Sequence, residues 1–412
     1  MSPSSDSFRN SLATIHADGR SGALVALGLG WFFVLGVRFT VPALLPFITR
    51  DFPVSNATAG AAITILWITY AAVQFPSGAL IDRVGERRLL TTSALLSAAA
   101  LVAYLGSVTF TVFLVATAAF GIGTGIFGPA RGTAVIRTFP DYEGFAYGTV
   151  LSGGSLGAAV LPALAAVLAS VLGWRVAIGV TVPGFLLVGL LVWRTIPPGT
   201  AADAVTDGST AIRSTAGRVY QGITNRGVLL GILGTTLMLF AFQGLTAFLT
   251  TYFVTAKGLS ESTAGILFGL LFIVAAFAQS LGGGLSDRFG HRAVLAVVTF
   301  VSVVPLVVLP YATGLGALAV VAASIGLRQA VIPVLNSYIV SLLPVDIRGT
   351  AWGMLRTGLF AVGSFGSILV GTMADADLFA EAFFFLAGLT ALSGLVFLVL
   401  PDRDDVKTAA SA

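Results

Sequence analysis

Four arginines lie inside long apolar segments of this 412-residue chain: Arg38, Arg131, Arg328 and Arg356. On insertion scales, an arginine at the centre of a membrane-spanning helix costs about 2.5–3.5 kcal/mol, and such residues usually face a cavity and mark a path for a bound molecule. A buried charge normally has a partner of opposite sign. All 18 aspartates and glutamates, however, fall in loops, tails or predicted helix ends. The sequence therefore predicts that a bound anion supplies the missing negative charge.

Several other kinds of chemistry lack the residues they need. The chain contains no cysteine, which excludes disulfides, thiolate metal sites and cysteine nucleophiles. Its two histidines, His16 and His291, fall outside the apolar segments, so no buried histidine-rich metal site is available. We therefore predict no catalytic residue, no metal and no cofactor, and a chain that is not an enzyme.

The composition indicates that membrane-spanning helices carry these arginines. Hydrophobic residues make up 56% of the chain and charged residues 10%, whereas a soluble chain carries about 25% charged residues. Twelve apolar segments are long enough to cross a bilayer, which predicts an all-α polytopic membrane protein. The segments are about 22–48, 58–81, 89–107, 110–136, 146–171, 174–195, 227–254, 262–284, 293–312, 315–342, 350–373 and 380–400.

Only one connection between these segments is longer than a short turn. It begins at Ile196 with Pro197 and Pro198 and continues through Thr, Ser, Gly, Asp and Arg, so it reads as a linker between two six-helix halves. The predicted domains are a tail 1–21, a six-helix bundle 22–195, the linker 196–226, a second bundle 227–400 and a tail 401–412.

An internal repeat supports two copies of one unit. Residues 55–90 match residues 260–295 at 15 of 36 positions when they are aligned without gaps. The offset of 205 residues therefore lets each half be read against the other.

The loops differ strongly in positive charge, and arginine and lysine favour the cytoplasmic side of a membrane. With the N-terminus inside, the inside loops and tails hold fifteen of these residues, against Arg50, Arg175 and Lys257 outside. We predict a plasma (inner) membrane protein with both termini and the linker in the cytoplasm. This topology explains the net charge of +4 without a nucleic-acid partner.

The repeat is most similar in a charged loop with the pattern G-x-x-x-D-R-x-G-x-R. The second glycine allows a tight turn, and the aspartate can accept hydrogen bonds at the N-terminus of a neighbouring helix. The pattern also fits a pair of tight turns whose arginines only fix the topology. Its residues are Gly78, Asp82, Arg83, Gly85 and Arg87 in the first copy, and Gly283, Asp287, Arg288, Gly290 and Arg292 in the second.

This doubled loop resembles the signature loop of the major facilitator superfamily, and the resemblance covers essentially the whole chain. It implies a secondary transporter with two six-helix bundles that works by alternating access. It also implies that Asp82 and Asp287 latch the cytoplasmic side closed, against helix 11 and helix 5 respectively.

Arg38 lies about two-thirds along helix 1 and Arg328 near the middle of helix 10, so both belong near the midplane. In that superfamily, helices 1, 4, 7 and 10 line a central cavity, which places both arginines on lining helices. Each is expected either to contact substrate or to bond helix carbonyls. The offset of 205 carries Arg38 onto Gln243, which should occupy the symmetry-related position. Gln329 and Asn336 are seven residues apart on nearly one face of a helix and would extend a polar stripe beside Arg328.

The other two buried arginines lie about six residues from the cytoplasmic ends of their helices. Arg131 either contacts substrate or extends to the interface, as long cationic side chains can. We expect Arg356 to act as a gate residue near Asp82.

The expected function is therefore transport of a small anionic solute: an organic acid, an organophosphate or an inorganic anion. Arginine suits these groups because its planar fork binds carboxylate or phosphate through two hydrogen bonds. The expected partners are this solute, a coupling proton or counter-anion, and the lipid bilayer, with the chain as a monomer. Two alternatives stay open: an efflux permease for apolar or cationic compounds, and a membrane-embedded sensor without transport.

Overall fold

The computed structural model describes residues 20–198, 225–343 and 348–401. Within these ranges the chain is helical without a strand, and twelve helices are long and apolar enough to cross a membrane. The twelve predicted segments each correspond to one of them, so the predicted fold class is confirmed. Nearly all residues of the two predicted tails and of the linker 196–226 lie outside the described residues.

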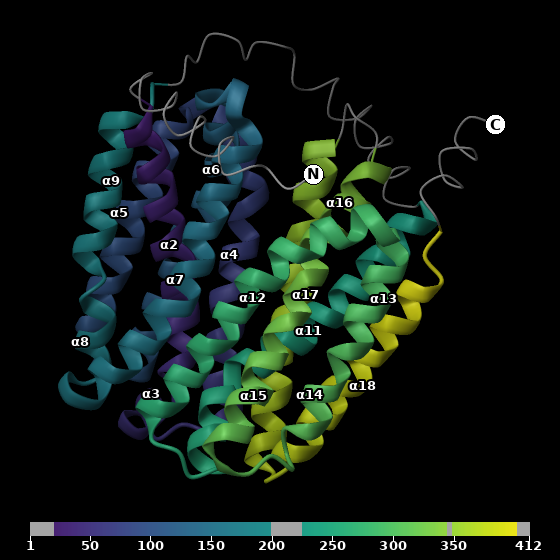
Figure 1. The fold of residues 1–412 in the computed structure, drawn as a ribbon. Helices are drawn as coiled ribbons and strands as arrows, with labels where there is room; N and C mark the ends of the chain where they lie inside the picture. The colour runs from purple at the N-terminus through teal and green to yellow at the C-terminus, as the bar shows by residue number, and fades with distance from the viewer. Residues whose placement is uncertain (1–19, 199–224, 344–347, 402–412) are drawn as a thin grey trace.

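Six of the twelve spans precede the linker and form the left half of the molecule in Figure 1. They are built from α2 (Ser21–Ala43), α3 (Leu45–Asp51), α4 (Asn56–Val84), α5 (Glu86–Leu105), α6 (Phe110–Thr138), a short 3₁₀ turn η1 (Pro140–Tyr142), α7 (Glu143–Leu172), α8 (Trp174–Gly179) and α9 (Val182–Thr195).

The other six spans follow the linker and form the right half. They are built from α11 (Arg226–Thr255), α12 (Glu261–Phe289), α13 (His291–Val301), α14 (Val303–Val308), α15 (Gly314–Gly326), η3 (Leu327–Ala330), α16 (Val331–Leu342), α17 (Arg348–Asp375) and α18 (Phe379–Leu398).

The repeat in the sequence is also a repeat in local structure. Ser55 and Ser260 both cap a helix, accepting a hydrogen bond from the backbone N–H of Thr58 (3.1 Å) and of Thr263 (3.3 Å). The helices that they start, α4 and α12, end at glycines with φ of 82° and 81°, a conformation that only glycine adopts readily. The 205-residue offset therefore reproduces both the start and the end of this helix.

Prolines interrupt four of the spans. A proline lacks an N–H and its ring crowds the carbonyl four residues earlier. The α-helices break within the two turns before Pro46, Pro183, Pro305 and Pro333, while Pro76, Pro129 and Pro162 sit in unbroken helices. The break before Pro333 forms η3, which divides the tenth span at Arg328 and Gln329.

The halves meet mainly through two antiparallel helix pairs, α4 with α17 and α7 with α12. We call the end where α4 begins and α17 ends the closed end, and the opposite end the open end. The two halves converge at the closed end, at the bottom of Figure 1, and separate toward the open end.

Candidate functional site: a cavity between the halves

A central cavity of about 290 Å³ lies between the two halves. Arg38 from α2 and Arg131 from α6 form part of one wall, and Gln243 from α11 and Arg356 from α17 form part of the other. No carboxylate lines this cavity among the described residues. The site therefore collects positive charge without a counter-charge from the residues that the structure describes.

Arg38 is the most deeply buried of these cations, at 1% exposure. Its Nε donates a long hydrogen bond of 3.4 Å to the carbonyl of Val34, one turn earlier on the same helix, whereas Nη2 has no partner. The guanidinium carbon lies 4.0 Å from the ring centre of Tyr70 and 5.0 Å from that of Trp67. Cation–π contacts therefore hold the group in place and leave hydrogen-bonding capacity unused.

Arg131 faces the same cavity from α6 and is 4% exposed. Its guanidinium carbon lies 4.1 Å from the ring centre of Trp31 and 5.2 Å from that of Tyr147, and its Nε and Nη1 have no hydrogen-bond partner. Arg38 also approaches Trp31, at 5.6 Å. One indole ring thus contacts both cations, and both residues line the central cavity.

Gln243 is 1% exposed, and neither its Nε2 nor its Oε1 has a hydrogen-bond partner. A buried amide left in this way costs roughly 1–3 kcal/mol. Both Gln243 and its repeat counterpart Arg38 line the central cavity. The offset of 205 residues therefore leads to the same cavity in both halves, with a charge in one half and a neutral amide in the other.

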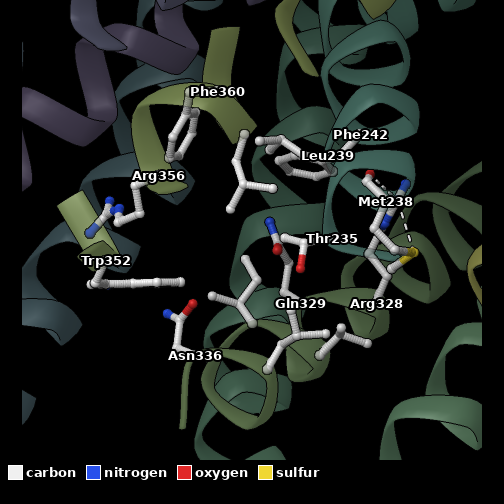
Figure 2. A pocket seen from close by; sticks show the side chains of 14 residues that line it. Thr235, Met238, Leu239, Phe242, Arg328, Gln329, Asn336, Trp352, Arg356 and Phe360 are labelled. Atoms are coloured by element: carbon white, nitrogen blue, oxygen red, sulfur yellow. Dashed lines mark hydrogen bonds between the residues drawn. The ribbon is translucent and has the colours of Figure 1, made fainter. Parts of the chain in front are cut away.

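A smaller side pocket of about 130 Å³ opens beside the central cavity within the C-terminal half. The two share wall residues, among them Leu239, Phe242 and Phe360. Figure 2 shows Arg328 at one side of the side pocket, against Met238, and Arg356 with Trp352 at the opposite side.

Arg328 is already partly satisfied by its own half. Its Nη2 donates to the carbonyl of Met238 at 2.9 Å and approaches the Met238 sulfur at 3.6 Å, while Nη1 has no partner. Its guanidinium also lies 5.3 Å from the ring centre of Phe242. Arg328 therefore differs from Arg38 and Arg131, because a carbonyl of a neighbouring helix, α11, accepts a short hydrogen bond from it, whereas the Arg38 bond is longer and stays within its own helix.

The remaining predicted polar residues surround the junction of the two cavities. Gln329, Asn336 and Arg356 line both of them. Arg356 is half-buried and stacks over Phe360 at 5.7 Å. All six residues predicted to contact substrate line one cavity or the other, and Arg356, predicted as a gate residue, lies on their shared wall.

Aromatic side chains from both halves close the cavity on the side of the closed end. We call Phe39, Trp67, Phe242, Phe272 and Phe360, which all line the cavity, the aromatic floor. The rings of Phe39 and Phe272 are 4.3 Å apart, and Trp67 stacks on Phe360 at 5.5 Å with an interplanar angle of 9°. Each of these two contacts joins one half of the molecule to the other.

Polar contacts across the halves reinforce the closed end. Asp375, at the end of α17, accepts hydrogen bonds from the backbone N–H groups of Asn56 (2.7 Å) and Ala57 (2.9 Å) at the start of α4. Its carboxylate there faces the positive end of the α4 dipole. In addition, Arg50 forms an ion pair with Glu261.

A further contact uses a carbonyl exposed by a helix break. Because Pro46 has no N–H, the carbonyl of Pro42 lacks its usual helical donor. The Thr250 hydroxyl of α11 donates to this carbonyl at 3.0 Å. The break between α2 and α3 thus creates an acceptor for the other half.

A separate polar cluster lies at the same end but within the N-terminal half. Asp51 accepts hydrogen bonds from Arg175 (2.6 Å) and from the indole of Trp174 (2.9 Å). Burial alone would raise the pKa of the Asp51 carboxyl, but these bonds and the charges of Arg175 and Arg50 outweigh it, so the pKa lies below its ordinary value.

The doubled loop motif lies at the open end. A Cβ added at Gly78 or at Gly283 would meet nothing within 4 Å. Asp287 is exposed, and no hydrogen bond or ion pair within the described part of the chain involves its side chain. The Asp82 side chain lies outside the described part, so the predicted latch stays a prediction. Among the motif arginines, Arg87 lies 4.3 Å from the ring centre of Trp193, and the exposed ones are Arg83, Arg288 and Arg292. Gly85 and Gly290 form the turns.

Sequence reasoning missed three features of this site. The 3₁₀ break at Arg328 could have been found from Pro333, which lies four residues after Gln329. The aromatic floor and the Asp375 cap had no such signal, because each depends on which residues of distant helices face one another.

Comparison with known proteins gives the family. The model of the Major Facilitator Superfamily matches residues 27–325 and 232–412. The putative uncharacterized transporter YgaY of Escherichia coli K12 is 27% identical over 174 residues, or 42% of this chain and 44% of that protein. The multidrug resistance protein MdtG of Proteus mirabilis is 28% identical over 134 residues, or 32% of this chain and 33% of that protein. The chain thus spans less than half the length of these curated relatives.

Solved structures match over nearly the whole chain and show the same fold. A bacterial homolog of the human lysosomal transporter Spinster, in an inward-facing and unoccupied conformation, has a TM-score of 0.72 at 18% identity and covers 95% of this chain and 97% of its own. A mutant of the nucleoside transporter NupG has a TM-score of 0.78 at 13% identity, with 92% and 99% covered. The twelve spans, the repeat and these matches show a multi-pass membrane protein that belongs to the Major Facilitator Superfamily, a family of transporters rather than of enzymes.

Proposed function

We propose that this chain transports a small anionic solute across a membrane by alternating access. The observation that carries the proposal is the set of buried guanidinium nitrogens without partners at the central cavity, on Arg38 and Arg131. Burying two cations at one cavity without a counter-ion is costly. An anion bound in the cavity offsets that cost.

The proposed binding residues have distinct roles. Arg38 and Arg131 hold the negative charge, and Gln243 donates or accepts a hydrogen bond at the facing wall. Gln329, Asn336 and Arg356 stand where the central cavity meets the side pocket. Arg328 positions η3 through its bond to Met238 and contributes positive potential.

The proposed orientation places the open end in the cytoplasm of a bacterial inner membrane. The arginines of the doubled loop lie at this end, and arginine-rich loops favour the cytoplasmic side. The cavity is then closed to the outside by the aromatic floor, Asp375 and the Arg50–Glu261 pair. The proposed latch at Asp82 and Asp287 would engage only when the open end closes.

Efflux of apolar compounds is the second candidate. The aromatic wall of the cavity and the relatives described as multidrug resistance proteins favour it. Cationic compounds fit poorly, because the cavity presents Arg38, Arg131 and Arg356 and no described carboxylate. The two candidates therefore differ in whether binding depends on the charge of Arg38.

A ligand screen of the purified protein tests the proposal. Carboxylates, phosphates and nitrate are compared with neutral sugars by thermal shift, on the native chain and on Arg38→Gln. We expect stabilisation by at least one class of anion, and its loss in the variant. Arg226→Gln, which changes an exposed arginine outside the cavity, should respond like the native chain. Stabilisation by neutral ligands alone, unchanged in Arg38→Gln, would contradict the anion proposal.

A further inference from the structure

Resting on this proposed function, we infer that the substrate is an amphiphilic organic anion: one carboxylate-type group joined to an apolar, ring-sized body. Inorganic anions and short acids would bind in the central cavity but leave the apolar side pocket empty. The inference comes from how the charge and the apolar surface are distributed over the two connected cavities.

The unused hydrogen-bonding capacity is concentrated on one side. Arg38, Arg131 and Gln243 all line the central cavity, and Arg38 and Arg131 both contact the Trp31 ring. Each of the three side chains holds buried polar atoms without a hydrogen-bond partner. Free donors on two guanidiniums and one amide suit a compact anionic head with several acceptor lone pairs. This is the place for the charged group.

The side pocket offers a different surface. Most of its lining residues are apolar, among them Met238, Leu239, Phe242, Leu359 and Phe360. Its one fully buried cation, Arg328, is turned onto the Met238 carbonyl and the Phe242 ring. An apolar group entering this pocket therefore meets carbon and sulfur atoms and finds few free hydrogen-bonding groups.

The two compartments are connected, so one molecule can occupy both. Phe242 and Phe360 line the central cavity as well as the side pocket, and Ile332, with 44% exposure, lies on the wall that they share. A head held at Arg38 and Arg131 thus has an apolar path into the C-terminal half. Because each half holds a different part of such a molecule, its binding would link the movement of the two halves.

A matched set of ligands tests the inference by titration calorimetry on the purified full-length chain. The set is 3-phenylpropionate, its neutral amide 3-phenylpropionamide, acetate, nitrate and inorganic phosphate. Burying a phenyl ring should tighten binding about tenfold or more over acetate. Removing the charge in the amide should weaken binding about tenfold or more relative to the acid.

Two variants test separately the binding of the charged group and the binding of the apolar body. Arg38→Gln should abolish the preference for acid over amide. Ile332→Trp places an indole on the wall that the two cavities share, so it should abolish the preference for 3-phenylpropionate over acetate. Val320→Trp, at a position with 67% exposure outside both cavities, is the control for adding a tryptophan, and size-exclusion chromatography checks that each variant is folded.

The outcomes distinguish this inference from the function on which it rests. If acetate, nitrate or phosphate binds as tightly as 3-phenylpropionate, the amphiphile inference is wrong and the anion proposal stands. If the amide binds as tightly as the acid in both the native chain and Arg38→Gln, both are wrong. If 3-phenylpropionate does not bind while a small anion does, the inference is overturned as well.

Discussion

The closed and open ends of the α4–α17 pair are built from the same kinds of residue, yet only one end is in contact. At the closed end, a Cβ at Gly60 would overlap the carbonyl of Ser367, and one at Gly371 would overlap that of Asn56. At the open end, a Cβ at Gly78 or at Gly353 would meet nothing within 4 Å.

The hydrogen bonds between α4 and α17 are also shorter near the closed end than near the open end. Thr64 donates to the carbonyl of Ser364 at 2.8 Å, and Thr357 donates to that of Ala71 at a longer 3.3 Å. Small residues that allow close approach therefore occur along the whole interface, but contact is made over only part of it. We infer that the unused part of the interface closes when the other part opens, which is what alternating access requires.

The largest expected effect comes from the aromatic floor. Phe39 is 5% exposed and joins the halves through Phe272, so Phe39→Ala should destabilise the closed end by about 3–5 kcal/mol. Thermal unfolding of the purified protein measures the loss. Phe277→Ala, which removes an equal ring from a site with 69% exposure, is the control; equal losses in the two variants would contradict a floor that holds the halves together.

Separating α4 from α17 at the closed end should have the next largest effect. Gly371→Leu forces a side chain against the Asn56 carbonyl, and overpacking of this kind typically costs about 1–3 kcal/mol. Gly358→Leu lies on the same helix, where an added Cβ meets nothing within 4 Å, and should be tolerated. Comparable destabilisation by both substitutions would mean that the two ends do not differ in packing.

Removing the charge of Asp375 tests the polar part of the closed end. Asp375→Asn keeps the size of the side chain but weakens its two bonds to the start of α4, and losing a helix cap typically costs about 0.5–2 kcal/mol. The variant should open the closed end more often, measured as faster alkylation of a cysteine introduced at Thr64, which is 3% exposed. Unchanged alkylation would show that Asp375 does not help to close it.

Thr250→Val should have a smaller effect, because one neutral hydrogen bond contributes about 0.5–1.5 kcal/mol. The valine leaves the Pro42 carbonyl without its donor and nearly preserves the volume. Faster alkylation at Thr64 is again expected, to a lesser degree than in Asp375→Asn. Thr255→Val, whose hydroxyl bonds only to its own helix at Thr251, should leave the rate unchanged.

The smallest effect is expected from Asp51, whose contacts stay within one half. Its folded pKa is lower than the unfolded value of 3.8, so its stabilisation is present above pH 3.8 and disappears as the pH falls through the folded value. Thermal unfolding scans from pH 3 to 7 should show this loss, and Asp51→Asn should reduce it. Because the cluster does not bridge the halves, Asp51→Asn should leave the rate of alkylation at Thr64 unchanged when both chains are compared at one neutral pH.

The sequence was sufficient for the fold and for several polar residues of the cavity, for different physical reasons. Helices in a membrane must satisfy their own backbone groups, so apolar length alone predicts each span. Arg38 was identifiable because a charged residue inside an apolar span is energetically costly and therefore indicates a functional role. The 205-residue offset of the repeat then pointed to Gln243. By contrast, the Asp375 cap was not predictable, since it depends on how far α17 and α4 lie apart at one end.

Cysteine crosslinking tests most directly whether the two ends close in turn around one cavity. The chain has no cysteine of its own, so Arg50→Cys with Glu261→Cys reports on the closed end, and Gly78→Cys with Gly353→Cys on the open end. In the ligand-free protein, a short bifunctional thiol reagent should join the first pair and leave the second unjoined. Once the first pair is joined, proteoliposomes should stop taking up the anion that stabilises the protein in the thermal-shift screen. Uptake should resume when the crosslink is cleaved. Continued uptake with the closed end locked would contradict the account.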